Sequence, residues 1–127
     1  NSSAASDVYK RKEKYQNQKV WALFQPHQYQ RTYLLFKDFV KAFDLADEII
    51  IAEIFEVAGR EEKEIAKKVS GEKLAEAIKK RLSEKNKNVH FIADFQKIPQ
   101  FLRGKTKSGD VILIMGAGDI YKLFASL

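Results

Sequence analysis

Four short apolar runs most constrain what this chain can fold into. They are Val20–Phe24, Ile49–Phe55, Val89–Ala93 and Val111–Met115. Each is nearly continuous rather than alternating, which is typical of strands buried on both faces of a sheet. A helical pattern follows each run, and strands that alternate with helices indicate βαβ units with right-handed crossovers. The sequence therefore predicts a parallel sheet with helices on both faces.

The segments between the runs carry helical periodicity. Ser70 is placed to cap one helix, Asp94 to cap another, and Pro99 should break or restart the latter. The highly charged stretch 57–69 fits either a solvated loop or a short exposed helix. The predicted helical ranges are 6–15, 31–43, 72–82 and 119–125. We predict an α/β fold, a Rossmann-like three-layer domain with a mainly parallel sheet of about four strands in the order 3-2-1-4.

Composition narrows the class of protein. A chain of 127 residues with 45% hydrophobic residues fits one domain with its own core. Cysteine is absent, which excludes disulfides, a thiol nucleophile and cysteine metal ligands. No apolar run approaches the roughly 20 residues of a membrane span and no signal peptide is visible, so we expect a cytoplasmic protein. The net charge of +6 fits a lysine-rich surface or a partner with phosphates or carboxylates; no nucleic-acid-binding motif accompanies it.

A dense set of polar side chains follows the first apolar run, in the turn Gln25–Thr32. In open α/β sheets, ligands bind at the carboxyl ends of the strands. The imidazole of His27 could bond a polar ligand or move a proton near neutrality, and Arg31 could grip a carboxylate or phosphate with two hydrogen bonds. Further hydrogen-bonding groups come from Gln25, Tyr29 and Thr32. For each residue the alternative is a structural role in the turn.

A second turn, Gly116-Ala117-Gly118-Asp119, follows the last run. Its glycines permit a sharp bend or a close approach to a ligand. A three-glycine dinucleotide motif would need glycine where the chain has Tyr121, so nucleotide binding is poorly supported. A tight turn capped by Asp119 is the alternative. The predicted strand order makes the first and fourth strands neighbours, so both turns would share one crevice.

Other polar residues carry weaker signals. Glu53 with Arg60 and Glu61 could hold a cation, although a charged loop is the favoured interpretation. His90 lies within a predicted strand and is expected to be a hydrogen-bonded structural histidine. The sequence contains no phosphate-binding P-loop, nucleophile elbow or zinc signature.

Two motifs in this order resemble a known family. The first is Val-Trp-Ala-Leu-Phe-Gln-Pro-His-x-Tyr-x-Arg-Thr at 20–32, and the second is Met-Gly-Ala-Gly-Asp-Ile at 115–120. Similar segments lie at 36–40, 46–48, 74–78 and 109–111. Together they resemble the C-terminal domain of the Mur ligases, in particular the branch that joins L-alanine to UDP-N-acetylmuramic acid. We therefore expect residues 1–18 to be a lead-in with a helix, its first residues flexible or left from cloning. Residues 19–127 would be the C-terminal, amino-acid-binding domain of a three-domain enzyme.

The resemblance implies a ligase of cytoplasmic peptidoglycan precursor synthesis. ATP would phosphorylate the muramic acid carboxylate, and the amine of L-alanine would attack the acyl phosphate. ATP and Mg²⁺ would be held mainly by a central domain that this chain does not contain, leaving the chain without a cofactor, a metal or a catalytic residue of its own. Its partners would be those substrates and the two other domains, with neither nucleic acid nor membrane. The implied substrate-binding residues are His27, Arg31, Tyr29, Thr32, Gly116, Ala117, Gly118 and Asp119.

Departures from the family pattern limit this assignment. Gln28 stands where the family usually has arginine after the histidine, and the upstream Asp-Tyr-x-His-x-Pro segment is absent from this sequence. Since the P-loop and the UDP-binding domain are also absent, we expect a fragment that cannot ligate alone. The alternatives are a free-standing module that binds an anion or nucleotide, a Mur ligase domain of other amino-acid specificity, and a basic nucleic-acid binder.

Overall fold

A computed structural model of the chain describes residues 2–56, 63–116 and 119–124. The strands are β1 (Val20–Phe24), β2 (Glu48–Ala52), β3 (Asn88–Ile92) and β4 (Val111–Met115). The helices are α1 (Ser2–Lys14), α2 (Tyr29–Leu34), α3 (Phe36–Lys41), α4 (Lys63–Ala66), α5 (Gly71–Arg81), α6 (Ile98–Lys105) and α7 (Asp119–Lys122), with a 3₁₀ turn η1 (Phe95–Lys97) before α6. None of the helices in the described ranges is long and apolar enough to cross a membrane.

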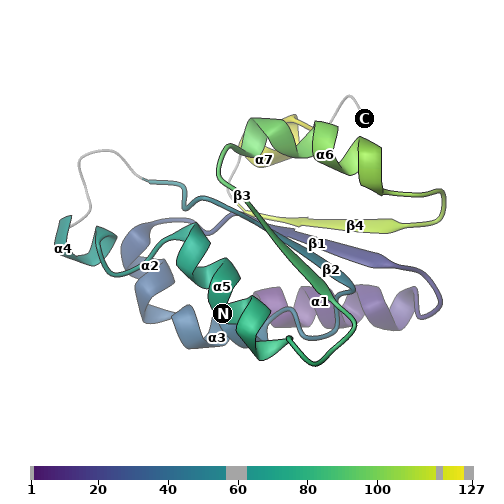
Figure 1. The fold of residues 1–127 in the computed structure, drawn as a ribbon, viewed down its shortest axis with the longest axis horizontal. Coiled ribbons are helices and arrows are strands. Elements are labelled where there is room, and N and C mark those ends of the chain that lie inside the picture. The colour runs from purple at the N-terminus through teal and green to yellow at the C-terminus, as the bar shows by residue number, and fades with distance from the viewer. Residues whose placement is uncertain (1, 57–62, 117–118, 125–127) are drawn as a thin grey trace.

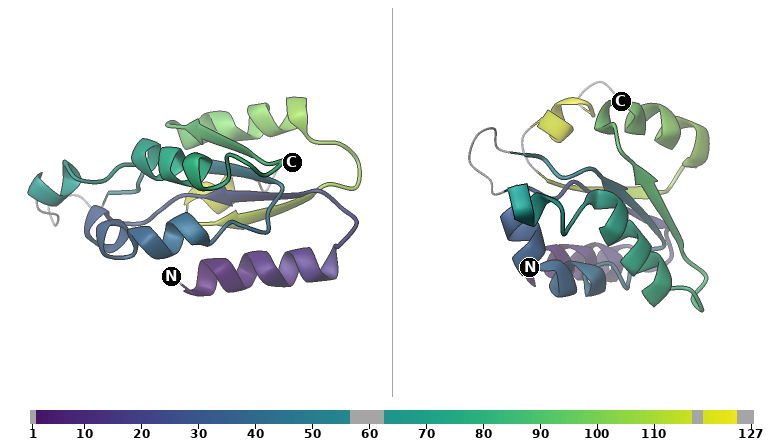
Figure 2. Two further views of the ribbon diagram at one scale, coloured as in Figure 1. Left: turned by 60° about the horizontal axis from the view of Figure 1, so that its bottom comes forward. Right: turned by 60° about the vertical axis from the view of Figure 1, so that its left-hand side comes forward.

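The four strands form one parallel sheet in the order β3-β2-β1-β4. This confirms the predicted fold class and strand order. Helices α1, α3 and α5 cover one face of the sheet, and α6 and α7 cover the other, which gives three layers (Figures 1 and 2). The strands' carboxyl ends point toward the side where α2 and α4 lie (Figure 1).

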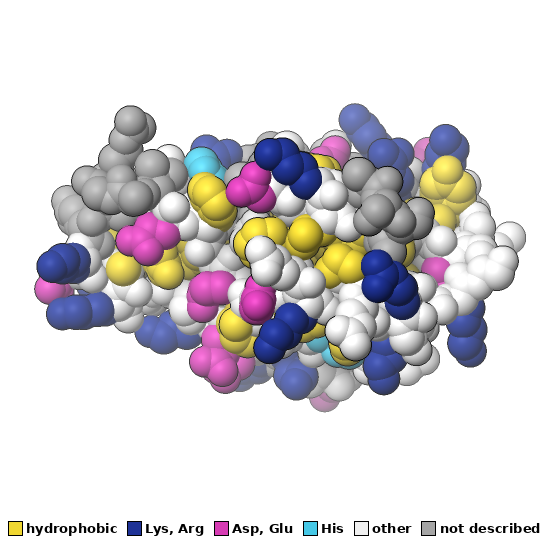
Figure 3. Space-filling model, turned by 90° about the horizontal axis from the view of Figure 1, so that it is seen from above, with side chains coloured by type: hydrophobic (Ala, Val, Ile, Leu, Met, Phe, Trp, Pro, Cys, Tyr) yellow, Lys and Arg dark blue, Asp and Glu magenta, His cyan; other side chains and the backbone are white. Residues whose placement is uncertain are grey.

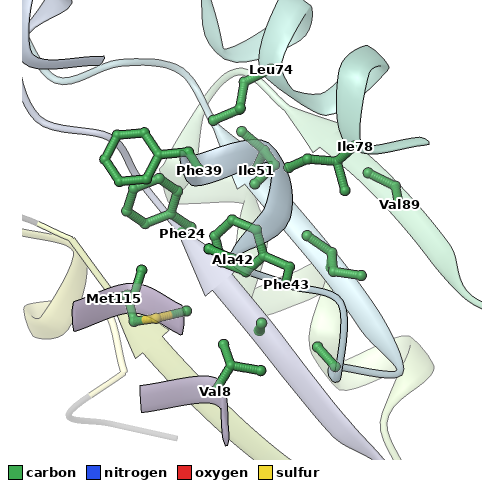
Figure 4. Packing of buried hydrophobic residues seen from close by; sticks show 14 of the residues in the cluster. Val8, Phe24, Phe39, Ala42, Phe43, Ile51, Leu74, Ile78, Val89 and Met115 are labelled. Carbon is green, nitrogen blue, oxygen red and sulfur yellow. The ribbon is translucent and has the colours of Figure 1, made fainter. Parts of the chain in front are cut away.

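Alternating side chains of the strands supply two hydrophobic cores. On the α1–α5 face, Phe24 of β1 packs with Phe39 and Phe43 at ring-centroid distances of 4.9 and 5.4 Å (Figure 4). On the opposite face, Trp21 and Leu23 pack with Ile98, Leu102 and Ile120 from α6 and α7. Burial of both faces explains why the strands are continuously apolar.

The α6 and α7 layer covers its face less completely. Apolar side chains remain visible through the middle of this face, between charged ones (Figure 3). Ile92, Ile112 and Ile114 are only partly buried there. On the other face the strand residues are more fully enclosed, as for Ile49 and Ile51 with 0% exposure. The thicker layer therefore carries most of the core.

The prediction of a single helix over 31–43 is wrong. Leu35, with φ −104° and ψ 13°, separates α2 from α3. The Leu35 N–H still donates to the Arg31 oxygen (3.0 Å), and the Phe39 N–H donates to the Leu35 oxygen (2.9 Å). Hydrogen bonds at four-residue spacing thus continue through the break. Apolar periodicity alone could not reveal it, since the inward side chains keep their spacing.

Other boundaries differ by a few residues. The predicted first helix is present but starts at Ser2, and the second strand ends at Ala52 rather than Phe55. Pro99 lies in the first turn of α6, where its missing N–H costs nothing, and Asp94 Oδ1 accepts the Gln96 N–H before it (3.0 Å). In the charged stretch, residues 63–66 form the short helix α4, and residues 57–62 lie outside the described ranges.

Candidate functional site

The carboxyl ends of β1 and β4 lie side by side. Phe24 pairs with Met115, and the Gln25 N–H continues the ladder by donating to the Met115 oxygen at 2.9 Å. From β1 the chain proceeds to β2 and β3 on one side, and it returns to β4 on the other. The point between β1 and β4 is therefore the topological switch point, where open α/β sheets bind ligands.

A cavity of about 210 Å³ opens at this switch point. His27 and Arg31 line it from the turn after β1, Gly116 lines it from the end of β4, and Asp7 lines it from α1. The apolar part of its wall includes Phe24, Phe39, Ile114 and Met115. Sites for drug-sized ligands measure roughly 300–1,000 Å³, so this cavity suits a smaller, charged molecule. Residues of the first turn therefore share a cavity with Gly116, the first residue of the second turn.

The ring of His27 is held against Phe55, which follows β2. The two ring centroids are 5.5 Å apart and the planes are 19° from parallel. Backbone bonds fix the pair, since the Phe55 N–H donates to the Pro26 oxygen and the Gln28 N–H donates to the Phe55 oxygen, both at 2.8 Å. The imidazole therefore reaches the cavity from a position that two chain segments define.

The residue after His27 has an unusual backbone conformation. Gln28 has φ 67° and ψ 136°, a region that residues with a side chain rarely adopt. Its oxygen accepts hydrogen bonds from the Thr32 N–H at 3.1 Å and from Thr32 Oγ1 at 2.7 Å. Thr32 is fully buried, so its hydroxyl holds the start of α2 in place. The turn delivers His27 and Arg31 to the cavity at the cost of local strain.

Gly116 lies tightly against the turn after β1. A Cβ at this position would come within 3.0 Å of the Gln25 oxygen and 3.1 Å of the Gln25 Cβ. The Gly116 N–H donates to the hydroxyl oxygen of Tyr121 at 3.3 Å. Glycine at 116 therefore allows the two turns to approach each other, which closes one side of the cavity.

Gln25 joins the ends of three strands. Besides the bond to β4, its Nε2 donates to the Glu53 oxygen beyond β2 at 3.3 Å. Gln25 is only 4% exposed, and its Oε1 is buried without a hydrogen-bond partner among the residues that the structure describes. A buried carbonyl without a partner costs roughly 1–3 kcal/mol, so its retention needs an explanation.

The Glu53 carboxylate has a structural role. Its Oε2 accepts the N–H groups of Ile54 (2.8 Å) and Gly71 (2.6 Å), which fixes the start of α5. Arg60 and Glu61, grouped with it in the sequence, lie outside the described ranges. His90 is hydrogen-bonded as expected, with Nε2 at 2.9 Å from Glu48 Oε1.

The structure brings only part of the predicted site together. His27, Arg31 and Gly116 line the cavity. Tyr29 and Thr32 do not line it, nor does Asp119, which forms an ion pair with Lys122 at 3.5 Å. Ala117 and Gly118 lie outside the described ranges. These roles therefore stay predictions.

Sequence reasoning missed three residues that shape the site. Asp7 was assigned to the lead-in, Tyr121 only excluded a nucleotide motif, and Phe55 was taken as a strand residue. None carries a local signal, because each reaches the site from a separate segment. The periodicity of the first helix, which buries Ala4 and Val8, could have placed Asp7 near the sheet edge.

The described residues also form hollows away from the switch point. A larger hollow of about 540 Å³ lies between α2–α3 and α4–α5, with Tyr33, Phe36, Lys37, Lys68 and Lys73 among its lining residues. It contains neither predicted turn and lies off the switch point. Within the described ranges, no group of three or more His, Asp or Glu side chains could hold a metal ion.

A charged cluster occupies the opposite, amino edge of the sheet. Partial burial alone would raise the pKa values of Asp47 and Glu48, but hydrogen bonds outweigh it and lower both pKa values. Asp47 Oδ2 accepts from Lys12 Nζ (2.9 Å) and the Val20 N–H (2.8 Å). Glu48 is paired with Asn88, His90 and Lys19. Since these contacts pair groups within the chain, the cluster stabilises the fold.

The fold is a parallel α/β domain with a cavity at the switch point of its sheet. A family model described as Mur ligase, glutamate ligase domain, matches residues 1–118. The chain belongs to the Mur ligase family.

Curated relatives agree with this assignment. The UDP-N-acetylmuramate–L-alanine ligase of Clostridium botulinum (strain Hall) is 42% identical over 121 residues, which are 95% of this chain and 24% of the relative. The ligase of the same name from Sulfurihydrogenibium sp. is 39% identical over 125 residues, 98% of this chain and 24% of the relative. The chain thus spans about a quarter of the length of the curated relatives it matches.

Two solved structures share the fold. The UDP-N-acetylmuramate-alanine ligase of Thermotoga maritima matches with a TM-score of 0.65 at 22% identity, over 94% of this chain and 22% of that one. A murein peptide ligase of Psychrobacter arcticus matches with a TM-score of 0.69 at 18% identity, over 99% of this chain and 24% of that one. At these identities the comparison supports the fold alone.

Proposed function

We propose that this chain is the C-terminal, amino-acid-binding domain of a cytoplasmic ligase that joins L-alanine to UDP-N-acetylmuramic acid. The observation that carries the proposal is the single cavity in which His27 and Arg31 meet Gly116 at the switch point. Relatives that are named for this ligation, at 39% and 42% identity, support the choice of substrates.

In the proposed reaction the muramic acid carboxylate attacks the terminal phosphorus of ATP, which releases ADP and leaves an acyl phosphate. The uncharged amine of L-alanine then attacks the acyl carbon. A C–N bond forms, the C–O bond to phosphate breaks, and phosphate and a proton leave. ATP and magnesium are assigned to another domain of the full-length ligase, because this sequence contains no phosphate-binding P-loop.

This domain contributes positioning. The guanidinium of Arg31 suits the carboxylate of L-alanine, which it can grip with two parallel hydrogen bonds. The His27 imidazole, fixed by Phe55, lies on the same cavity and can donate to that carboxylate. Closure of the domain over the acyl phosphate would exclude water, which otherwise hydrolyses it.

The test is steady-state ligation by the full-length enzyme that carries this domain, with ATP, UDP-N-acetylmuramic acid and L-alanine. Arg31→Ala should raise the KM for L-alanine about 10- to 100-fold, since a bond to a charged group contributes about 1.5–3 kcal/mol, and leave the KM for ATP unchanged. Arg103→Ala is the matched control, because Arg103 is an exposed arginine on α6. An unchanged KM for L-alanine in a folded Arg31 variant would refute the role.

Two further arms test the alternatives. Glycine, L-serine and a dipeptide replace L-alanine, and preferred use of one of them would assign the domain to a ligase of other specificity. The 127 residues alone should show no ligation. ATP binding by the isolated chain would instead favour a free-standing nucleotide module.

A further inference from the structure

The cavity at the switch point presents two kinds of polar group. Arg31 and His27 can serve a carboxylate, as proposed above. Gln25 and Asp7 line the same cavity, and the amide oxygen of the one and the carboxylate of the other are hydrogen-bond acceptors that do not suit a negative ligand. A free amino acid carries both a carboxylate and an amino group, so its second group needs acceptors of this kind.

We propose that Gln25 and Asp7 form the subsite for the amino group of the substrate, Gln25 by accepting a hydrogen bond and Asp7 by supplying negative charge. This assignment rests on the proposed function. It adds a positioning role for two residues outside the pair that holds the carboxylate.

The geometry of Gln25 supports the acceptor role. Its Nε2 faces the Glu53 oxygen, and a flipped amide would set two oxygens against each other, so Oε1 is the atom left for a donor. Among the described residues, Oε1 has no partner. A carbonyl buried at a cost to stability is accounted for if the bound substrate supplies its donor.

Access to Oε1 requires only a small movement. The bond from Nε2 to the Glu53 oxygen is 3.3 Å long, beyond the usual 2.7–3.2 Å range for such bonds, so the amide is weakly held. The last torsion of a glutamine side chain has a broad energy minimum. The proposal requires a limited rotation about this torsion, short of a flip, that exposes Oε1 to the cavity that Gln25 already lines.

Asp7 supplies the charge that an amide lacks. It lies on α1 with its side chain exposed, and it is the only carboxylate among the described residues that line the cavity. An exposed carboxylate attracts an ammonium group without the cost of burying a charge. The substrate can therefore bind as a zwitterion and lose a proton before attack.

The experiment measures, in the full-length ligase, the KM for L-alanine and inhibition by two partial analogues. Propionate has the carboxylate without the amine, and ethylamine has the amine without the carboxylate. Gln25→Met, which keeps the shape but removes the acceptor, should raise the KM for L-alanine about 10-fold or more and weaken inhibition by ethylamine equally. Inhibition of the Gln25→Met variant by propionate should stay unchanged. Arg31→Ala should instead weaken inhibition by propionate and leave inhibition by ethylamine unchanged.

Controls separate this inference from loss of fold and from the proposed function. Gln100→Met on exposed α6 should leave all three constants unchanged. If Gln25→Met does not fold, Asp7→Asn on the surface of α1 carries the same test, with an expected threefold or larger rise in the KM for L-alanine. An unchanged KM in the folded variant, or equal losses for propionate and ethylamine, overturns the amine subsite alone. A wild-type enzyme that does not use L-alanine overturns the proposed function instead.

Discussion

His27 and Phe55 stack face to face, with ring centroids 5.5 Å apart and planes 19° from parallel. They come from the ends of different strands, and their backbones form a parallel bridge beyond the regular sheet. The pairing of β1 with β2 therefore continues into the turn that carries the candidate site. His27, a cavity residue in a connecting segment, is thereby held by backbone hydrogen bonds and by a ring contact.

The first prediction follows from this pair. Phe55→Ala removes the surface on which the imidazole rests, and aromatic pairs contribute about 0.5–1.5 kcal/mol beyond burial. We expect the KM for L-alanine in the full-length ligase to rise about 2- to 10-fold, with little change in the KM for ATP. Phe95→Ala, which removes another partly buried ring on the α6 face, is the control. Equal effects of both variants on the KM for L-alanine would refute the positioning role.

A second prediction concerns the strained residue Gln28, whose φ of 67° disfavours any side chain. Such strain costs about 1–3 kcal/mol, and glycine relieves it while losing about 0.5–1 kcal/mol through greater freedom of the unfolded chain. Gln28→Gly should therefore raise the free energy of unfolding by about 1 kcal/mol in urea denaturation. Gln28→Ala keeps a Cβ and should give no such gain. A destabilised Gln28→Gly would mean that the side chain makes a necessary contact.

A third prediction contrasts two glycines. At Gly71 a Cβ would lie 2.5 Å from the Ala52 oxygen and 2.9 Å from the Glu53 Cα, both backbone atoms. Gly71→Ala should destabilise the fold by about 1–3 kcal/mol, because α5 must move away from β2. At Gly104 no heavy atom lies within 4 Å of the added Cβ, so Gly104→Ala in α6 should stabilise by about 0.5–1 kcal/mol. Thermal unfolding measures both, and the same sign for the two would contradict the packing described.

The fourth prediction is a pH dependence. The pKa of Glu48 is lowered in the folded state by hydrogen bonds from Asn88, His90 and Lys19, which outweigh its burial. A carboxylate with a lowered folded-state pKa stabilises the fold above its unfolded pKa, whose ordinary value is 4.5, and this stability is lost as the pH falls through the lowered value. The wild-type chain should thus lose more stability between about pH 5 and pH 2 than Glu48→Gln.

An exposed ion pair provides the control for the pH experiment. Asp44 Oδ2 lies 2.6 Å from Arg81 Nη2, with both side chains more than a third exposed. Exposed pairs contribute about 0–1 kcal/mol, so Asp44→Asn should barely change the unfolding curve at neutral pH. If Asp44→Asn lowers the free energy of unfolding at neutral pH as much as Glu48→Gln does, the buried hydrogen bonds of Glu48 contribute no more than an exposed ion pair, and the prediction is wrong.

The strands could be predicted from the sequence because a strand that is buried on both faces needs apolar residues at nearly every position. The run Val20–Phe24 is apolar at every position, and this alone predicted a central strand. The order 3-2-1-4 was predicted by analogy with half of a doubly wound sheet, and it was confirmed. The break at Leu35 was not readable, because the hydrogen bonds and apolar spacing of α2 and α3 run through it.

By itself, the sequence determined the fold class and the two turns that carry His27, Arg31 and Gly116. Buried strands and turns both depend on the types of residues that are adjacent in the chain. Only the tertiary structure decided that Asp7 lines the same cavity and that Phe55 supports His27. It also decided that Gln25 Oε1 is buried with no partner in the described part of the chain. Each of these relations joins segments tens of residues apart in the chain. They exist because the strands stack in a particular order and register, which no local pattern specifies to the nearest atom.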